Sequence, residues 1–409
     1  MPTSGTPRIF YGWIVVAASF AALVLIFGVT YSFSAFFSSL QGEFGASRAE
    51  VSLVFSLCGF VYMGLGLFTG SIADRVGPRW LAIGGFVLLS ACLIAASRAE
   101  SIRMLYLAYG LGAGIGAGCI YVPAIGAVQP WFIRRRALAS GLASSGIGVG
   151  TLLVPLLAVA LIDASGWRKA FEILGWIVLV FGVTAGFLLD NAPAKRGLAP
   201  DGDTGSGGAK PAQAPRGITL REAIRTRAFW MLYLGCGAFS IGLFIPFVHL
   251  APYARDHGLS DQTGVMLMGL IGAGSIAGRF SLAGIGDRIG RRGLLVAVYA
   301  VSCVCFLIWL ASSHVIALAT FALVFGTAYG VFVAVQPPLA MDFFGARNVS
   351  GIIGAIYTSA ALAMLVGPPL AGLAFDLTRS YTLPIAISAL LMVMALGCAI
   401  VLLRERPRI

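Results

Sequence analysis

The sequence predicts an all-α membrane protein with twelve transmembrane helices, arranged as two pseudo-symmetric bundles of six. Its 409 residues are 59% hydrophobic and only 11% charged, with a mean hydropathy of +0.93, whereas soluble domains carry about 25% charged residues. The chain also divides into about twelve apolar stretches, each near the length of about 20 residues that spans a bilayer as a helix. A charged segment that occurs twice, half the chain apart, indicates a duplicated bundle.

The apolar stretches are long and continuous. Helix is the expected structure, because a backbone in lipid must satisfy its own hydrogen bonds, and barrel strands would instead alternate over about ten residues. The predicted spans are 11–39, 49–73, 79–97, 103–131, 137–162, 169–190, 228–253, 262–286, 293–312, 315–341, 349–375 and 381–403.

The repeated segment reads GSIADRVGPR at 70–79 and AGIGDRIGRR at 283–292. Asp74 and Asp287 are therefore 213 residues apart, about half the chain. Each copy lies between two apolar stretches, as expected if each half of the protein carries the same charged turn at the same membrane edge. Parallel repeats of this kind place a substrate site near the bilayer midplane, between the halves.

The net charge of +12 could suggest nucleic-acid binding, but the placement of the basic residues indicates a membrane orientation. With the amino terminus inside, 20 of the 28 Lys and Arg residues fall on one side and seven on the other, with Arg279 left over. This is the positive-inside pattern. We expect a multi-pass membrane protein with both termini cytoplasmic and no nucleic-acid partner.

The organisation of the chain is set by its one extended polar segment, residues 191–227. This segment is rich in Gly, Pro, Ala and charge, a composition typical of a flexible linker. It divides the chain into an N-terminal six-helix bundle at 1–190 and a C-terminal six-helix bundle at 228–409. Its last part, 218–224, suggests a short amphipathic helix at the membrane surface.

No metal or cofactor site is predicted. The seven cysteines all fall within predicted spans and show no zinc-type spacing. Glycines recur in the fourth and eighth spans, but no strand precedes them, so close helix packing explains them better than a dinucleotide-binding loop. The sequence shows no nucleophile–base pair or paired carboxylates, which argues against an enzyme.

Arg279 is the ionisable residue that falls clearly inside a span. It lies eight residues before Asp287, or about 12 Å along a helix, which places it near the midplane. A guanidinium there costs at least about 2.5–3.5 kcal/mol on insertion, and its planar fork fits a carboxylate through two parallel hydrogen bonds. A salt bridge to a neighbouring helix is the alternative, but no mid-span Asp or Glu is present. An anionic substrate is therefore predicted to bind Arg279.

Three tyrosines are candidate partners for that substrate: Tyr121 in the fourth span, Tyr329 in the tenth and Tyr357 in the eleventh. Each combines an apolar ring with one hydrogen-bonding group, which suits a small organic acid. Ser144 in the fifth span and Gly28 in the first complete the candidate substrate-binding set. Ordinary helix packing is the alternative for all five residues.

His249 is the histidine that falls within a span, near its outer end. Its unperturbed pKa of about 6.5 suits a proton relay, and it is the candidate for proton coupling. A solvated histidine in an outer vestibule is the alternative.

The two repeated turns are assigned a different role. Asp74 with Arg75, and Asp287 with Arg288, pair an acid with a base at a helix end. Such groups can latch neighbouring helices and separate when the two halves rock. We expect them to act as a conformational lock rather than as a binding site.

These turns resemble the signature between the second and third helices of the major facilitator superfamily and its echo between the eighth and ninth. Within that superfamily, the segment WFIRRRALASGLASSGIGVG at 131–150 resembles the fifth-helix signature of the monocarboxylate transporters and the related oxalate/formate antiporters. Arg279 falls where those families place a carboxylate-binding arginine. The resemblance implies the major facilitator fold and transport of L-lactate with a proton.

The chain departs from both families. The mammalian-type monocarboxylate carriers have an aspartate one turn before the arginine, where this chain has Ser275, and its first span lacks their acidic motif and lysine. The oxalate antiporters carry a lysine in the eleventh helix, where this chain has Ala360. Because a dicarboxylate needs two cations, a single arginine favours a substrate with one carboxylate.

The sequence therefore predicts secondary transport of small monocarboxylates such as L-lactate or pyruvate, with a proton, by alternating access. An organic anion exchanger of the oxalate/formate type and an exporter of amphiphiles are the transport alternatives, and a nutrient sensor with a transporter fold is the alternative of another class. The partners expected are a monocarboxylate anion, a proton and the lipid bilayer.

Overall fold

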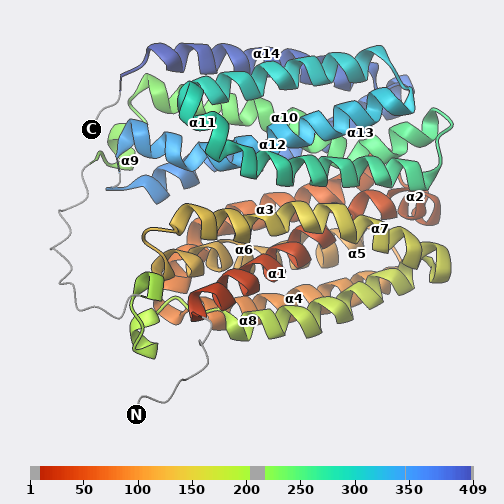
Figure 1. The fold of residues 1–409 in the computed structure, drawn as a ribbon. Helices are drawn as coiled ribbons and strands as arrows, with labels where there is room; N and C mark the ends of the chain where they lie inside the picture. Colours follow the sequence, from red (N-terminus) through yellow and green to blue (C-terminus); the bar gives the residue numbers. More distant parts are fainter. Residues whose placement is uncertain (1–9, 203–216, 346, 407–409) are drawn as a thin grey trace.

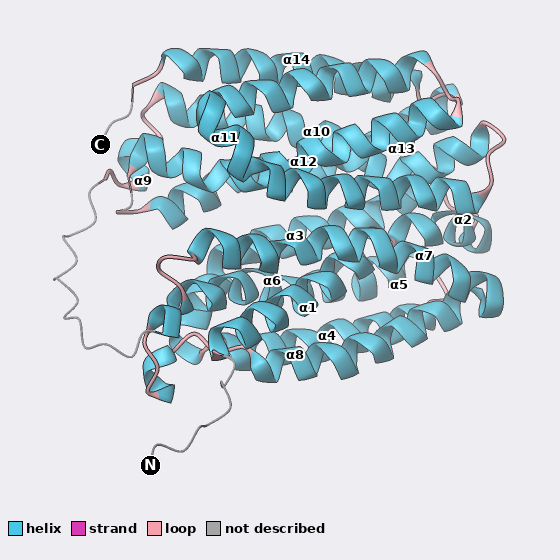
Figure 2. Cartoon of the chain, viewed as in Figure 1, coloured by secondary structure: helices cyan, strands magenta, loops and turns pink. Residues whose placement is uncertain are grey.

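The computed structural model describes residues 10–202, 217–345 and 347–406; within these ranges the side chains of residues 67, 71, 74, 137, 194–195, 281–288 and 350 are not described. The described residues form helices joined by loops (Figure 2). The α-helices are α1 Tyr11–Tyr31, α2 Phe33–Phe44, α3 Arg48–Val76, α4 Pro78–Ser97, α5 Ile102–Leu105, α6 Gly114–Val128, α7 Arg136–Ile177, α8 Val183–Leu188, α9 Leu220–Ala223, α10 Arg227–Asp256, α11 Asp261–Ala311, α12 Val315–Phe344, α13 Val349–Thr378 and α14 Thr382–Arg404. The short 3-10 or π-helical segments are η1 Tyr106–Ala113, η2 Gln129–Trp131, η3 Val178–Gly182, η4 Pro193–Arg196 and η5 Pro200–Gly202.

The predicted membrane-spanning architecture is confirmed. In the part of the chain that the structure describes, eleven helical stretches are long and apolar enough to cross a membrane. One of them, Leu138–Leu188, has 51 residues and is broken by the non-helical Gly166, at φ 79°, so it makes two crossings. The total is the twelve crossings expected from the sequence.

The duplication seen in the sequence is also present in the backbone. A left-handed backbone favours glycine, because a Cβ would crowd the neighbouring carbonyl. Three pairs of residues with positive φ are each separated by 213 positions: Gly45 and Gly258 (58° and 80°), Gly77 and Gly290 (94° and 71°), and Gly166 and Arg379 (79° and 55°). The N-cap serines Ser47 and Ser260 have the same separation. The two halves therefore turn at equivalent positions.

Helices α1–α8 lie together on one side of the molecule and α10–α14 on the other (Figure 1). The two groups meet mainly along α3 with α13 and along α7 with α11. The first described helix starts, and the last one ends, at the same end of the molecule (Figure 1), which we call the terminal face. The opposite end, which carries the turns at Gly45, Gly166, Gly258 and Arg379, is called the distal face.

The end of the segment between the two groups packs on α12. The N–H of Ile218 donates to the carbonyl of Phe344 at 2.9 Å. The short helix expected at 218–224 is observed as α9 and begins with a capping box, in which Thr219 and Glu222 each satisfy the other's backbone N–H. Hydrogen bonds from the Thr219 backbone and hydroxyl lower the pKa of the Glu222 carboxyl.

Small residues let α11 and α12 approach closely. A Cβ at Gly330 of α12 would lie against the carbonyl oxygen of Ser275 in α11, far inside contact distance, and a Cβ at Gly278 would meet the carbonyl of Thr327 in the same way. Close backbone approach through small residues is the usual basis of helix association in membranes. This contact fixes which α12 side chains face α11.

Gly330→Ala is therefore expected to lower the midpoint of thermal unfolding, because overpacking a tight contact costs about 1–3 kcal/mol. The matched control is Gly397→Ala in α14, where an added Cβ meets nothing within 4 Å. Thermal unfolding of the two purified variants in the same detergent measures the difference. Equal midpoints would show that the α11–α12 contact has room to relax.

Candidate functional site

Arg279 lies in the first part of α11, ahead of the break at Gly290, and is 6% exposed. The close packing of α11 on α12 brings the Tyr329 ring beside it, with the guanidinium carbon 5.6 Å from the ring centroid. This distance is within the range of a cation–π interaction. The aromatic face offsets part of the cost of burying the charge.

The guanidinium is only partly satisfied by the protein. Its Nη1 donates to the Ser275 carbonyl oxygen at 3.1 Å and to the Ser275 hydroxyl, one helical turn away. Nε and Nη2 are buried and have no hydrogen-bond partner among the described residues. A buried donor without a partner costs about 1–3 kcal/mol, more when it is charged.

The two free donors lie on one edge of the guanidinium, the edge that matches both oxygens of a carboxylate. Among the described residues, no acidic side chain bonds to Arg279. The guanidinium therefore offers two parallel N–H donors and a full positive charge to a small anion. Ser275 holds the Nη1 side of the guanidinium in place.

The three predicted tyrosines, on α6, α12 and α13, lie near one another, and Tyr329 and Tyr121 lie near Arg279. Tyr121 is within electrostatic range of both Arg279 and Tyr329, and Tyr357 is within range of both Tyr121 and Tyr329. Tyr121 also packs edge-on against Phe27 of α1, with ring centroids 5.2 Å apart. The cluster thus combines hydroxyl groups with apolar ring walls.

Two further tyrosines in this cluster were not identified from the sequence. The Tyr31 hydroxyl of α1 lies 3.5 Å from the Tyr329 hydroxyl, and Tyr62 of α3 packs edge-on against Tyr121 at 6.2 Å between centroids. Tyr62 lies at the middle of the predicted span 49–73, so its depth in the membrane could have identified it from the sequence. Tyr31 lies near the end of its helix, and only its contact across to α12 identifies it.

For the other two predicted substrate contacts, Gly28 and Ser144, the structure shows helix-packing contacts. A Cβ on Gly28 would press against the Val154 side chain of α7, so the absence of a side chain serves the α1–α7 contact. The Ser144 hydroxyl donates to the carbonyl of Gly141 in its own helix at 3.1 Å. These contacts are those of helix packing and do not join either residue to Arg279.

His249 of α10 is fully buried, which contradicts the alternative of a solvated vestibule histidine. Its Nε2 lies 2.8 Å from the carbonyl oxygen of Pro368 and 3.2 Å from the Ser52 hydroxyl. A carbonyl cannot donate, so we assign the proton to Nε2. Nδ1 then accepts from the Tyr381 hydroxyl at 2.9 Å. The imidazole is thereby hydrogen-bonded on both nitrogens, close to the distal face.

The predicted lock residues are only partly covered by the structure. Arg75 is exposed, whereas the side chains of Asp74, Asp287 and Arg288 lie outside the described residues. Basic residues beside the same turns do pair with acids: Arg79 Nη2 lies 3.8 Å from Asp190, and Arg291 forms an ion pair with Asp342.

The fold and the site define a membrane carrier class in which two repeated helical bundles meet around a buried cation. The family model of the Major Facilitator Superfamily matches residues 18–358 and 282–409, and the chain belongs to this superfamily. It is accordingly a member of a transporter family rather than an enzyme.

Among characterised relatives, the chain is 30% identical over 396 residues to Monocarboxylate transporter 12-B of Danio rerio, a match that covers 91% of this chain and 83% of the relative. It is 30% identical over 386 residues to Monocarboxylate transporter 4 of Rattus norvegicus, covering 91% and 78%. MFS-type transporter 1 of an Ophiocordyceps species is 26% identical over 369 residues, covering 89% and 78%.

Solved structures match along the whole chain. A bacterial homologue of the human lysosomal transporter Spinster, in an inward-facing and occupied conformation, superposes with a TM-score of 0.73 at 16% identity, covering 98% of both chains. The inward-facing and unoccupied structure gives a TM-score of 0.68 at 17% identity, covering 98% of this chain and 96% of the other. At these identities the likeness shows the fold alone.

Tyr381→Phe is expected to lower the thermal midpoint of the protein. The change removes the hydroxyl that donates to His249 Nδ1 and leaves that buried acceptor unpaired, at a cost of about 1–3 kcal/mol. The matched control is Tyr299→Phe, because Tyr299 is also buried and no hydrogen bond is observed for its hydroxyl among the described residues. Thermal unfolding that does not distinguish the two variants would contradict a stabilising hydrogen bond between Tyr381 and His249.

Proposed function

We propose that this protein is an alternating-access carrier of small monocarboxylates, with L-lactate and pyruvate as candidate substrates, moved together with a proton. The observation that carries the proposal is the free Nε–Nη2 edge of the buried Arg279. The names of the relatives, which are monocarboxylate transporters, support the same substrate class.

In this proposal Arg279 binds the substrate carboxylate through its free edge. Tyr121, Tyr329 and Tyr357 contact the substrate oxygens or form the pocket walls. With one cation and no second one among the described residues of the cluster, the site neutralises a single carboxylate. Neutralising the buried charge lowers the cost of occluding the site, which allows the halves, residues 1–190 and 228–409, to rock about it with 191–227 as their linker.

His249 is the proposed proton relay. Its imidazole lies between a carbonyl acceptor and the Tyr381 hydroxyl, so it has both a donor and an acceptor in reach. Since no acidic side chain among the described residues bonds to Arg279, the substrate carboxylate itself is the other group available to handle a proton.

Anion exchange is the second candidate function, and one observation favours it. The empty site leaves a buried guanidinium without a counter-charge, so returning the empty carrier costs more than returning a loaded one. A carrier whose empty form returns slowly exchanges one anion for another.

The positive-inside pattern supports an orientation with the terminal face in the cytoplasm of a bacterial inner membrane. The charged turns of Asp74, Arg75, Asp287 and Arg288 then lie at the cytoplasmic side. We propose that they form the conformational lock between inward-open and inward-closed states.

The central prediction concerns Arg279. In proteoliposomes with an imposed inward proton gradient, uptake of radiolabelled L-lactate is expected to be abolished by Arg279→Ala. Arg279→Lys keeps the charge but loses the fork, and we expect a KM about 10–100-fold higher, because a hydrogen bond to a charged group contributes about 1.5–3 kcal/mol.

Collapse of the proton gradient separates the two candidate functions. Proton-coupled transport predicts that wild-type uptake falls when the gradient is removed, whereas exchange predicts uptake that ignores the gradient and requires an anion inside. Survival of uptake in well-folded Arg279→Ala would reject the arginine site, and absence of uptake by the wild type would reject L-lactate.

Ser275→Asp tests the missing counter-charge. A carboxylate one turn from Arg279 would neutralise the guanidinium and compete with the substrate, so we expect a higher KM that decreases as the pH is lowered and the new acid takes a proton. Ser275→Asn, which has the same size and no charge, is the matched control. An unchanged KM in the aspartate variant would mean that the anion does not bind at the Arg279 guanidinium.

A further inference from the structure

An ion pair joins the two halves of the molecule at the distal face. Arg48, the first residue of α3, forms a bidentate pair with Asp256 at the end of α10, with both nitrogen–oxygen distances at 2.7 Å. The same guanidinium lies over the Phe375 ring of α13, 3.7 Å from its centroid, and donates to the Tyr381 hydroxyl at 2.7 Å. One side chain of the first half therefore contacts three elements of the second.

The backbone at the start of α3 is held by the second half as well. The Asp376 carboxylate of α13 accepts from the N–H groups of Arg48 and Ala49 at 3.1 and 3.0 Å, donors that a helix leaves free at its first turn. A Cβ on Gly372 would lie 2.7 Å from the Ala49 nitrogen, so α13 crosses the start of α3 without space for a solvent layer.

The internal repeat explains why this pair joins the two halves. In the first half, Glu43 and Arg168 form an ion pair at 2.9 Å. The residues 213 positions later are Asp256 and Tyr381. The second half has thus kept the acid and lacks the cation, because tyrosine cannot neutralise a carboxylate at neutral pH. Arg48 takes the place of that missing cation from the other half.

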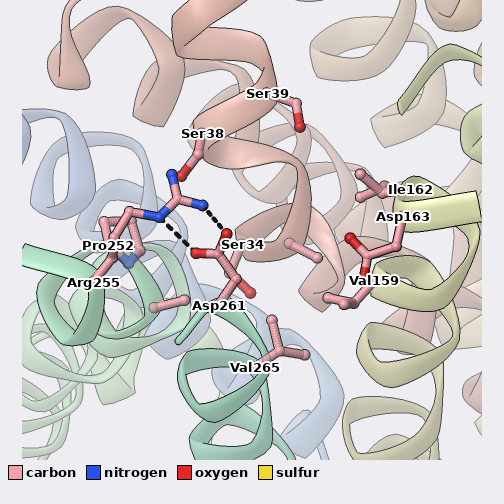
Figure 3. Close-up of a pocket in the computed structure, with 12 residues that line it drawn as sticks. Ser34, Ser38, Ser39, Val159, Ile162, Asp163, Pro252, Arg255, Asp261 and Val265 are labelled. Carbon is pink, nitrogen blue, oxygen red and sulfur yellow. Dashed lines mark hydrogen bonds and ion pairs between the residues drawn. The ribbon is translucent and has the colours of Figure 1, made fainter. Parts of the chain in front are cut away.

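Among the described side chains, the symmetry-related crossing of α7 with α11 has no such ionic contact between the halves. The equivalents of Arg48 and Asp376 there are Asp261 and Asp163, two like charges that repel. Asp261 pairs instead with Arg255 of its own half, and Asp163 lines the opposite wall of a small cavity between α7 and α11 (Figure 3). Among the described residues, the ion pair that joins the two halves at the distal face is therefore on the α3–α13 side.

Two sets of contacts lie on this side of the central site. The Tyr381 hydroxyl that accepts from Arg48 donates in turn to His249. Deeper in the molecule, Tyr31 of the first half stacks on Phe247 of the second at 4.2 Å between centroids, and its hydroxyl reaches Tyr329. Two layers, one ionic and one aromatic, thus separate Arg279 from the distal face.

We propose that Arg48 is a gating residue of the carrier, which holds the distal face closed through Asp256, Asp376 and Tyr381 and releases all three when the central site opens to that side. The proposal uses the alternating access of the proposed function but does not depend on which substrate is carried. The side chains of Arg48 and Asp256 are 12% and 27% exposed, so their pair is less screened by solvent than an ordinary surface pair.

The test reads access to the interface behind Arg48 with a chemical label instead of transport. Ser56 is two turns further along α3 and is fully buried. Its hydroxyl has no hydrogen-bond partner among the residues that the structure describes, so Ser56→Cys is a mild reporter change. A membrane-impermeant maleimide is applied separately to right-side-out and inside-out vesicles. Labelling of the seven native cysteines is subtracted with the parent protein that keeps Ser56.

In this background, Arg48→Ala is expected to label about tenfold faster from one vesicle orientation, which corresponds to about 1.4 kcal/mol less free energy holding the gate closed. Arg168→Ala removes the equivalent ion pair inside the first half and is expected to leave labelling unchanged. The exchanged double variant Arg48→Asp with Asp256→Arg is expected to restore protection, and it guards against loss of fold as the cause.

Equal labelling of Arg48→Ala and Arg168→Ala would overturn the proposal, as would a monodisperse double variant that is labelled as fast as Arg48→Ala. Because labelling needs no substrate, the two proposals can fail separately. A protein that shows the labelling pattern but does not take up lactate keeps the gate and rejects the substrate, and the reverse result rejects the gate alone.

Discussion

The structure depends on the placement of one permanent charge deep among apolar helices. Arginine cannot escape the cost of burial by losing its proton, so the protein must arrange neighbours that tolerate the guanidinium of Arg279. It does so with neutral groups: Ser275 accepts from one nitrogen, and the Tyr329 ring faces the cation. Ser275 lies one turn earlier on the same helix, and the Tyr329 ring comes within reach because α12 lies so close to α11 that Gly330 has no space for a side chain.

With only neutral neighbours, the positive charge of Arg279 has no negative partner among the described residues. A carboxylate from the protein would have neutralised the arginine and occupied its free N–H groups, but the described residues around it offer only neutral groups: a carbonyl oxygen, hydroxyl groups and aromatic rings. The missing negative charge is therefore a property that a ligand can supply. In the proposed carrier, the empty and the anion-bound protein differ by a full charge at this site.

The internal repeat also shows how a duplicated fold becomes asymmetric. The backbone has kept its turns at equivalent positions, since each needs a left-handed residue to reverse direction. The side chains at those turns have diverged: the cation at position 168 has no counterpart at 381, and a different residue, Arg48, neutralises Asp256. An ion pair that stabilises one half has a counterpart that joins both halves.

Much of the fold was predictable because the relevant forces act locally along the chain. Long apolar runs require helices in lipid, and the twelve crossings follow their predicted spans within several residues. Arg279 was identified for the same reason, since its charge and depth can be read along one helix. Tyr121, Tyr329 and Tyr357 were predicted from depth alone, and the structure places them near one another.

What the sequence by itself determined is the helical membrane architecture, the duplication and the presence of a buried cation without an acidic partner in its own span. Only the tertiary structure decided which edge of Arg279 stays free, that Tyr31 and Tyr62 join the tyrosine cluster, and that His249 is enclosed rather than solvated. The physical reason is that these properties depend on contacts between helices far apart in the sequence. Hydropathy and charge along the chain do not encode which helix faces meet.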